Sequence, residues 1–414
     1  MNGVNLKTNT NIKLPLSFII YALAALAFAV VVLFANSGEL LAGEFRMPKI
    51  WMSAHVLLLG FALMTAMGAM YQLVPVTFLT PIWNQGFGYV QFAVTAVGLT
   101  VFALLLGYRT ELAVYGAGVF VIGVLMFLFQ MGMTLRAKKE HNVMYYFLIS
   151  ALTSLFLTIT FGFMLVFNFA FGEVFRHVSV LLSHMTAGVA GWFTMLIMAL
   201  SYKLVPMFSL SHGFSMKWSK GALSLYLMGL VALILSYWID LAGLRQSGFL
   251  FLFFGFGCYF LDMKEILTKR MKKNLDHPFT FSIFAIINGL VIHFLAALAA
   301  FLKNDSQTFW SWLIFLYIFT WILFSIIGYL YKIMPFLWWT HKYSEKSGKE
   351  EVPLLKDLLN ERLGTALFIL FIFSVGGIFL SVALETGMLL FIGLGLLAFT
   401  SFLYGISVIM VLFK

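Results

Sequence analysis

The sequence contains apolar runs that are longer than a water-soluble domain tolerates. Residues 52–71 carry no Asp, Glu, Lys or Arg over 20 positions, and residues 178–202 carry none over 25. A helix needs about 20 mostly apolar residues to cross the hydrocarbon core of a bilayer. Only 10% of all residues are charged, against roughly a quarter in average soluble domains. The chain is therefore predicted to be an all-α integral membrane protein in contact with the lipid bilayer.

Apolar stretches of this kind recur along the whole chain, so 1–414 is predicted to be a single transmembrane domain. The first stretch begins near Leu14 and has no small-residue cleavage pattern, so it is interpreted as a span and not as a signal peptide. About twelve transmembrane helices are predicted, at 14–36, 50–75, 86–107, 112–135, 143–171, 176–206, 219–241, 247–267, 279–302, 309–335, 363–383 and 386–412.

The basic residues lie mostly on one side of the predicted spans. With both termini on the cytoplasmic side, twenty Lys and Arg residues fall on the inner side and six on the outer side. The positive-inside rule predicts such an excess for a multi-pass protein of the cell (plasma) membrane. The net charge of +10 is explained by this topology and by attraction to anionic lipid, so no nucleic-acid partner is expected.

Three predicted helices end in the same way, which indicates an internal repeat. Their inner ends carry a tyrosine followed four positions later by a proline: Tyr71 to Pro75 (YQLVP), Tyr202 to Pro206 (YKLVP) and Tyr331 to Pro335 (YKIMP). The prolines are 131 and 129 residues apart, which corresponds to four spans each time. The twelve helices are interpreted as three pseudo-symmetric four-helix units, approximately 1–140, 141–276 and 277–414, with helices 2, 6 and 10 equivalent. Chance is the alternative interpretation.

Histidines provide the candidate metal ligands, because the single cysteine, Cys258, excludes a disulfide or a multi-thiolate site. Eight histidines are present, and four of them, His55, His177, His184 and His293, lie inside predicted spans, where polar groups are costly and often functional. At about 1.5 Å per residue, all four fall in the outer half of the bilayer. Imidazole nitrogen suits iron and copper, so a metal or heme layer is predicted there. A hydrogen-bonded core histidine is the alternative at each position.

His177 and His184 differ in their predicted roles. They are seven positions apart, which places them on one helix face but roughly 10 Å from each other. That distance is too large for both to bind one metal atom. We therefore predict that His184 is a ligand and that His177, with the neighbouring Arg176, holds an anionic group such as a heme propionate.

Helices 2 and 6 also carry a family resemblance. Helix 2 has His55, Gly60-Phe61 and the YQLVP ending, and helix 6 has His184, Gly191-Trp192 and the YKLVP ending. These features resemble the histidine-containing helices of heme-copper oxidase subunit I, most closely in its high-affinity bacterial branch and the nitric oxide reductases. The resemblance implies twelve helices in three four-helix arcs, cytoplasmic termini and hemes in the outer half of the membrane. The chain is also similar to twelve-helix, heme-binding membrane proteins associated with nitric oxide tolerance.

The resemblance implies roles for two residues and leaves other positions unfilled. His55 corresponds to the ligand of the low-spin heme, and His184 to a copper ligand. The family also has a histidine pair on helix 7 and two ligands on helix 10, but residues 219–240 and 309–335 contain no histidine. A complete heme–heme–copper centre is therefore not expected, and no deep acidic residue is present to relay protons. The predicted cofactor-binding set is His55, His177, His184, His293 and Arg176, with His55 and His184 as the metal ligands.

Three functions follow from these patterns. The first is a heme b protein that binds or acts on nitric oxide or another diatomic gas, or that relays electrons from quinol; if it is an enzyme, it is a heme-dependent oxidoreductase. Besides heme iron, copper is a candidate metal for this function. The second function is a membrane transporter or assembly factor for heme, copper or a small solute. The third is a structural role, as a catalytically inactive subunit that supports another membrane complex. The partners considered are a second copy of this chain or a different membrane subunit.

Overall fold

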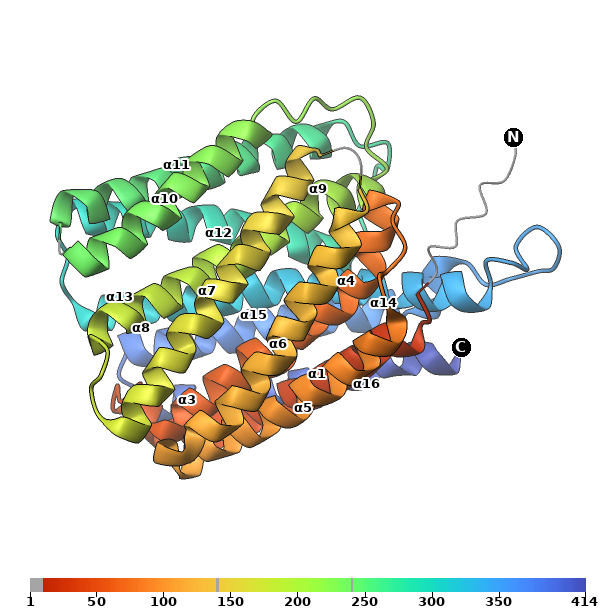
Figure 1. Ribbon diagram of the computed structural model, residues 1–414. Coiled ribbons are helices and arrows are strands. Elements are labelled where there is room, and N and C mark those ends of the chain that lie inside the picture. Colours follow the sequence, from red (N-terminus) through yellow and green to blue (C-terminus); the bar gives the residue numbers. More distant parts are fainter. Residues whose placement is uncertain (1–9, 139–140, 240) are drawn as a thin grey trace. The chain divides into compact units, whose positions relative to one another are not determined.

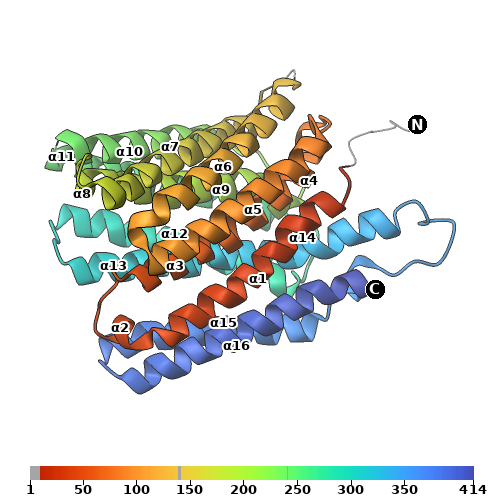
Figure 2. The same cartoon turned by 60° about the horizontal axis from the view of Figure 1, so that its bottom comes forward.

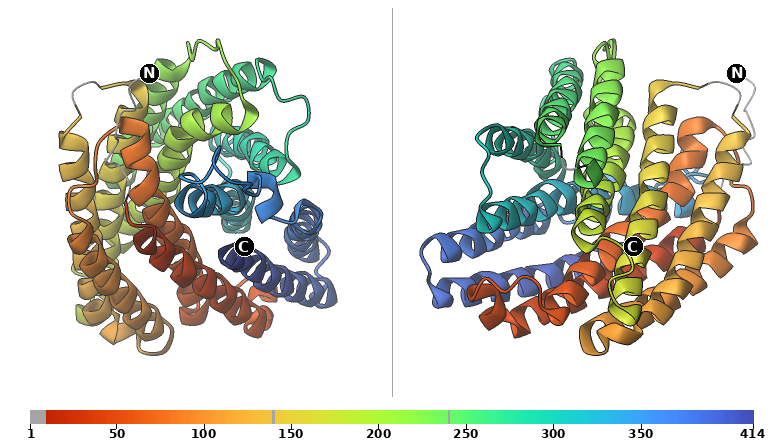
Figure 3. Two further views of the ribbon diagram at one scale, coloured as in Figure 1. Left: turned by 90° about the vertical axis from the view of Figure 1, so that its right-hand side faces the viewer. Right: turned by 60° about the vertical axis from the view of Figure 1, so that its left-hand side comes forward.

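The computed structural model describes residues 10–138, 141–239 and 241–414, apart from the side chains of residues 382 and 383. This part of the chain is helical and contains no strand, as both views of Figure 3 show. A backbone that crosses lipid has to satisfy its hydrogen bonds within itself, which a helix does. Eleven helices of the described part are long and apolar enough to cross a membrane. The prediction of an all-α, multi-pass membrane protein is confirmed at this level.

The chain divides into two compact units, which we describe separately. Unit 1 comprises the residues up to 139 and from 326 onward, and unit 2 comprises residues 140–325. The elements of unit 1 are α1 (Lys13–Ala35), α2 (Ser37–Leu41), α3 (Pro48–His55), η1 (Val56–Leu63), α4 (Met64–Phe78), α5 (Gln85–Tyr108), η2 (Thr110–Leu112), α6 (Ala113–Arg136), most of α14 (Phe324–Lys342), η5 (Leu355–Leu358), α15 (Glu361–Ala383), α16 (Gly387–Ile409) and η6 (Met410–Phe413). Those of unit 2 are α7 (Val143–Phe171), α8 (His177–Met185), η3 (Thr186–Thr194), α9 (Met195–Ser209), α10 (Ser219–Ile239), α11 (Ala242–Thr268), α12 (His277–Phe301), α13 (Gln307–Leu316) and η4 (Tyr317–Leu323).

In unit 1, small residues allow neighbouring helices to approach closely. Helix α1 packs against both α4 and α16, and Figure 2 shows α1 and α16 side by side. Between α5 and α6, a Cβ on Gly98 would lie 2.4 Å from the backbone nitrogen of Phe120, and a Cβ on Gly116 would lie 2.6 Å from that of Phe102. Glycine is therefore required at both positions, as is common where helices meet in membranes.

In unit 2, the consecutive helices α10 and α11 form the same kind of close pair, visible in Figure 1. A Cβ on Gly229 of α10 would lie 2.8 Å from the backbone nitrogen of Leu252, and one on Gly255 of α11 would lie 2.7 Å from that of Tyr226. Helix α11 also packs against α12, and α7 packs against α8, η3 and α9. A cavity in this unit is lined by residues of α8, η3, α10, α11, α12, α13 and η4.

One predicted span differs from the other eleven. The stretch predicted at 247–267 forms helix α11, which is 27 residues long, but it is absent from the helices of the described part that are apolar enough to be candidate spans. Arg245 lies near one end of α11, and Asp262, Lys264 and Glu265 lie near the other. The described part of the chain therefore contains eleven candidate spans, and the twelfth stays a prediction.

Helices 2, 6 and 10 share one irregular construction. Each joins an α segment, a π-helical segment and a second α segment, as α3–η1–α4, α8–η3–α9 and α13–η4–α14. Each π segment ends twelve residues before a proline: Leu63 before Pro75, Thr194 before Pro206, and Leu323 before Pro335. In these three helices 67–72% of the most apolar window is buried, against 33–50% in the other eight candidate spans. The common construction agrees with the predicted repeat, which itself stays a prediction.

Candidate functional site

His55 is the last residue of α3, immediately before the π segment η1. Its Nδ1 lies 2.7 Å from the carbonyl oxygen of Trp51, and its ring meets that of Phe102 edge-on, with the centroids 5.5 Å apart. Because a carbonyl oxygen only accepts hydrogen bonds, we assign the hydrogen to Nδ1 and the lone pair to Nε2. Metal-ligating histidines are usually oriented by such a bond.

His184 has a similar arrangement in unit 2. It lies in α8, two residues before the π segment η3, and its Nδ1 is 2.9 Å from the carbonyl oxygen of Thr158 on α7. Gly162 makes room for the ring, because a Cβ at that position would lie 2.9 Å from Cε1 of His184. The imidazole therefore packs against α7, with its hydrogen on Nδ1.

Arg176 and His177 lie at the start of α8. The backbone N–H of His177 donates to Oε1 of Glu173 at 3.0 Å, and the imidazole lies 5.8 Å from the ring of Phe169. Arg176 donates from Nη1 to the carbonyl oxygen of Trp238, near the end of α10, at 3.0 Å. These contacts tie the start of α8 to its neighbours, and the predicted binding of an anionic group by the two residues stays a prediction.

His293 lies in the middle of α12 and is only 3% exposed. Its Nδ1 is 2.7 Å from the carbonyl oxygen of Gly289, so this histidine too carries its hydrogen on Nδ1. Its Nε2 is 3.0 Å from the hydroxyl of Tyr226 and 3.2 Å from that of Tyr317. The ring stacks on Phe256 of α11, with the centroids 4.3 Å apart. His293 is thus held on three sides by three different helices.

The hydroxyls beside His293 belong to a larger buried network. The hydroxyl of Tyr317 is 2.7 Å from Oγ1 of Thr194 and 3.2 Å from the hydroxyl of Tyr226. Oγ1 of Thr194 also accepts from Nε1 of Trp321 at 3.0 Å and donates to the carbonyl oxygen of Val189 at 3.0 Å. Since the one hydroxyl hydrogen of Thr194 is used in this way, Tyr317 donates to Thr194. Tyr226 then donates to Nε2 of His293.

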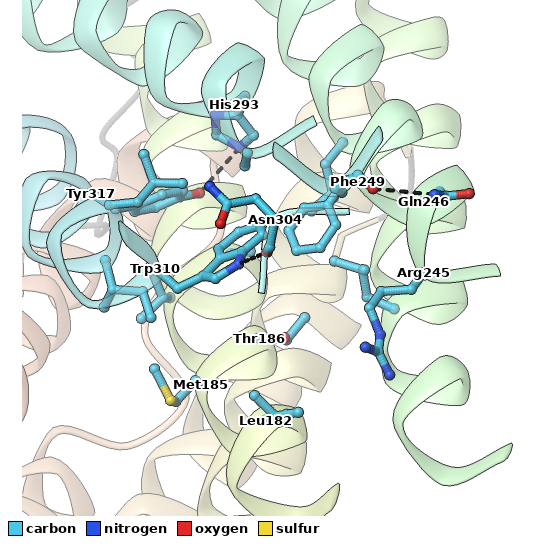
Figure 4. A pocket seen from close by; sticks show the side chains of 18 of the residues that line it. Leu182, Met185, Thr186, Arg245, Gln246, Phe249, His293, Asn304, Trp310 and Tyr317 are labelled. Atoms are coloured by element: carbon cyan, nitrogen blue, oxygen red, sulfur yellow. Dashed lines mark hydrogen bonds between the residues drawn. The ribbon is translucent and has the colours of Figure 1, made fainter. Parts of the chain in front are cut away.

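A cavity of about 460 Å³ adjoins this network within unit 2. Figure 4 shows His293 and Tyr317 close together on the cavity wall, and we call this part of the cavity the His293 end. Polar residues from the start of α11 and from the connection between α12 and α13 also line it: Arg245, Gln246, Lys303, Asn304 and Asp305. The rest of the wall is mostly apolar and includes Leu233, Phe249, Leu252, Ile292, Trp310, Leu313 and Ile314. The cavity therefore combines apolar walls with polar groups from several helices.

The predicted site residues are divided between the two units. His55 belongs to unit 1, whereas the other four belong to unit 2, and of those four only His293 lines the cavity. No group of three or more His, Cys, Asp or Glu side chains that could hold a metal ion is found among the residues the structure describes. Tyr226 and Tyr317 are absent from the predicted site, which is built only on histidines and the arginine beside one of them. Their signal is a tyrosine in mid-span, away from the helix ends where this residue type is usual.

Comparison with known proteins gives no relative: no protein-family model matches the chain, and no curated sequence matches it. The resemblance to heme-copper oxidase subunit I rests on the residues of helices 2 and 6 and on the predicted span architecture.

Proposed function

We propose that this chain is a b-type heme protein of the cell membrane, with cytoplasmic termini and a helix arrangement like that of heme-copper oxidase subunit I. One repeated observation carries the proposal. In two of the three most buried spans, a histidine lies within two residues of a π segment and has its Nδ1 bonded to a backbone carbonyl, at His55 and at His184. π-helical segments occur frequently at functional sites.

The donor set suits heme better than it suits a bare copper ion. A heme macrocycle brings four nitrogen ligands, so one oriented histidine is enough to complete the binding of its iron. A copper site needs several protein ligands, and His184 belongs to no group of three candidate ligands among the described residues. Bound heme would supply an iron centre that can bind a diatomic gas or accept electrons from quinol. His55 and His184 would each hold iron through Nε2.

An absorption spectrum tests this function. The full chain, expressed with an adequate supply of heme, is expected to show a Soret band and the bands of a b-type heme. His55→Ala and His184→Ala, singly or together, should remove heme, whereas His341→Ala, which changes an exposed histidine at the end of α14, should not. Absence of heme from the wild-type protein, or full heme content in the double variant, would contradict the proposal.

Two further measurements on the same samples distinguish binding of a diatomic gas from electron relay. Nitric oxide added to the reduced protein should shift the Soret band if the protein binds or acts on a diatomic gas. Addition of a quinol to the oxidised protein should produce the reduced spectrum if the protein relays electrons.

The cavity favours a second candidate, a transporter or assembly factor for heme, copper or a small solute. It combines polar residues with apolar walls, a lining that also suits a small solute. Saturable uptake into proteoliposomes by the heme-free protein would support this function. Heme that stays bound through purification and responds to nitric oxide or quinol would argue against it.

A further inference from the structure

The cavity of unit 2 has the size and polarity of a site for a lipophilic ligand. Its volume of about 460 Å³ lies within the range of roughly 300–1,000 Å³ found for cavities that bind drug-sized molecules. A diatomic gas would leave most of this space empty. Because the cavity lies among predicted spans and has apolar walls, a ligand that dissolves in the bilayer would enter it more readily than a charged solute would.

The His293 end can present either a hydrogen-bond acceptor or a donor. In the structure, Tyr226 donates to Nε2 of His293, but the hydroxyl oxygen of Tyr317 is also within its reach, at 3.2 Å. If the Tyr226 hydroxyl rotates toward Tyr317, Nε2 becomes an acceptor for a ligand. If the hydroxyl of Tyr317 rotates away from Thr194, it becomes a donor to a ligand. Since both His293 and Tyr317 line the cavity, one oxygen atom of a ligand can meet either kind of partner.

We propose that this cavity binds the ring of a quinone in its oxidised and reduced forms, with one ring oxygen at the His293 end. The hydroxyl of the quinol would donate to Nε2 of His293, and the carbonyl of the quinone would accept from Tyr317. Phe249 and Trp310, whose ring centroids are 5.2 Å apart, supply aromatic surface on the cavity wall. The role of this ligand as electron donor rests on the proposed function, whereas its binding does not.

The ability of the His293 end to offer either a hydrogen-bond acceptor or a donor favours a quinone over other membrane lipids. A sterol or a fatty alcohol carries a hydroxyl in one state only, and a site for it needs no second arrangement. A quinone changes between two C=O groups and two O–H groups, so a site that holds both forms has to change with it. The pair of tyrosines around His293 provides that change without moving a helix.

Binding to the full-length protein in nanodiscs tests the assignment. The probes are decylubiquinone and its quinol, titrated calorimetrically with empty nanodiscs as the blank. His293→Phe keeps a ring against Phe256 but removes both nitrogens, and it should weaken binding of both probes about tenfold to a hundredfold, which corresponds to the loss of a buried hydrogen bond. Ala296→Trp places an indole in the cavity, which Ala296 lines, and should abolish saturable binding.

Leu298→Trp is the matched control, because it adds an indole to the same helix at a side chain that is 40% exposed and does not line the cavity. Its affinity should equal that of the wild type. Equal affinity in all variants would overturn the assignment, as would competition by cholesterol or decanol at the strength of the quinone. Should His293→Phe fail to fold, Ala296→Trp and Tyr317→Phe decide the question.

Heme content, measured in the same samples, separates this inference from the proposed function. Wild-type protein that carries heme but binds no quinone saturably refutes the inference alone. Protein that binds the quinone through His293 but never carries heme refutes the heme proposal and leaves the cavity assignment standing.

Discussion

Thr194 connects two buried side chains to the backbone of its own helix, so its hydroxyl group can be tested by removing it. Replacement by valine keeps the shape of the side chain but takes away the acceptor of Trp321 Nε1 and of the Tyr317 hydroxyl. The Tyr317 hydroxyl keeps Tyr226 and His293 within hydrogen-bond distance. The indole N–H of Trp321, which is fully buried, loses its partner.

The size of the effect follows from that single unpaired donor. Leaving a buried donor unsatisfied costs about 1–3 kcal/mol, whereas side-chain hydrogen bonds in membrane proteins contribute on average only about 0.6 kcal/mol and at most about 1.7. Because Trp321 is fully buried, we expect a value in the middle of the range for an unsatisfied donor. Thr194→Val should therefore lower the free energy of unfolding by about 2 kcal/mol.

Unfolding in sodium dodecyl sulfate, followed by circular dichroism, measures this change. Thr160→Val is the matched control in the same unit, because its exposed hydroxyl bonds only to the carbonyl oxygen of Phe156 on its own helix, and it should change stability by less than about 0.5 kcal/mol. Thr194→Ser retains the hydroxyl and should recover most of the loss. Equal stability of Thr194→Val and Thr160→Val would refute the reasoning.

Two further substitutions test the packing of each unit by the same measurement. In unit 1, Gly98→Leu should lower the free energy of unfolding by about 3 kcal/mol, because its Cβ would lie 2.4 Å from the backbone of Phe120. Gly118→Leu, with open space at its Cβ, should leave stability unchanged. Equal losses in the two variants would contradict the close contact of α5 and α6. In unit 2, Asp262→Leu should also lower the free energy of unfolding by about 3 kcal/mol. The buried carboxylate of Asp262 accepts hydrogen bonds from the hydroxyl of Tyr202 and from the backbone N–H of Trp218, and leucine removes both. Asp262→Asn should recover part of that loss, and a neutral Asp262→Leu would refute the role of these bonds.

The spans were predictable because lipid leaves an apolar chain little choice. A long apolar segment in hydrocarbon has to pair its own backbone groups, which makes it a helix whatever its neighbours are. Eleven of the predicted spans therefore correspond to helices that meet the same criterion in the described structure. The stretch at 247–267 is helical as well and packs as α11 beside α10 and α12, but it is not among the candidate spans of the described residues.

The cavity was not predictable, because it depends on which helix faces lie together. His293 was recognised as a buried polar residue, but its partners Tyr226 and Tyr317 come from two other helices that lie 67 residues before it and 24 residues after it in the sequence. Nothing in the composition of those helices indicates that their tyrosines contact the same imidazole. The π segments were missed for a related reason, since a shift of the backbone hydrogen-bond register leaves no mark in hydropathy.

The π segments also bear on how such a chain arose. A π segment in an α-helix lengthens the backbone hydrogen-bonded turn by one residue, so a single inserted residue is enough to create one. Three helices with separate origins would have needed three insertions, each twelve residues from a proline. If the predicted repeat holds, one insertion in an ancestral helix, followed by copying of the whole four-helix segment, accounts for all three. The predicted repeat would then place the irregular turn before the copying, although the segments now have 8, 9 and 7 residues.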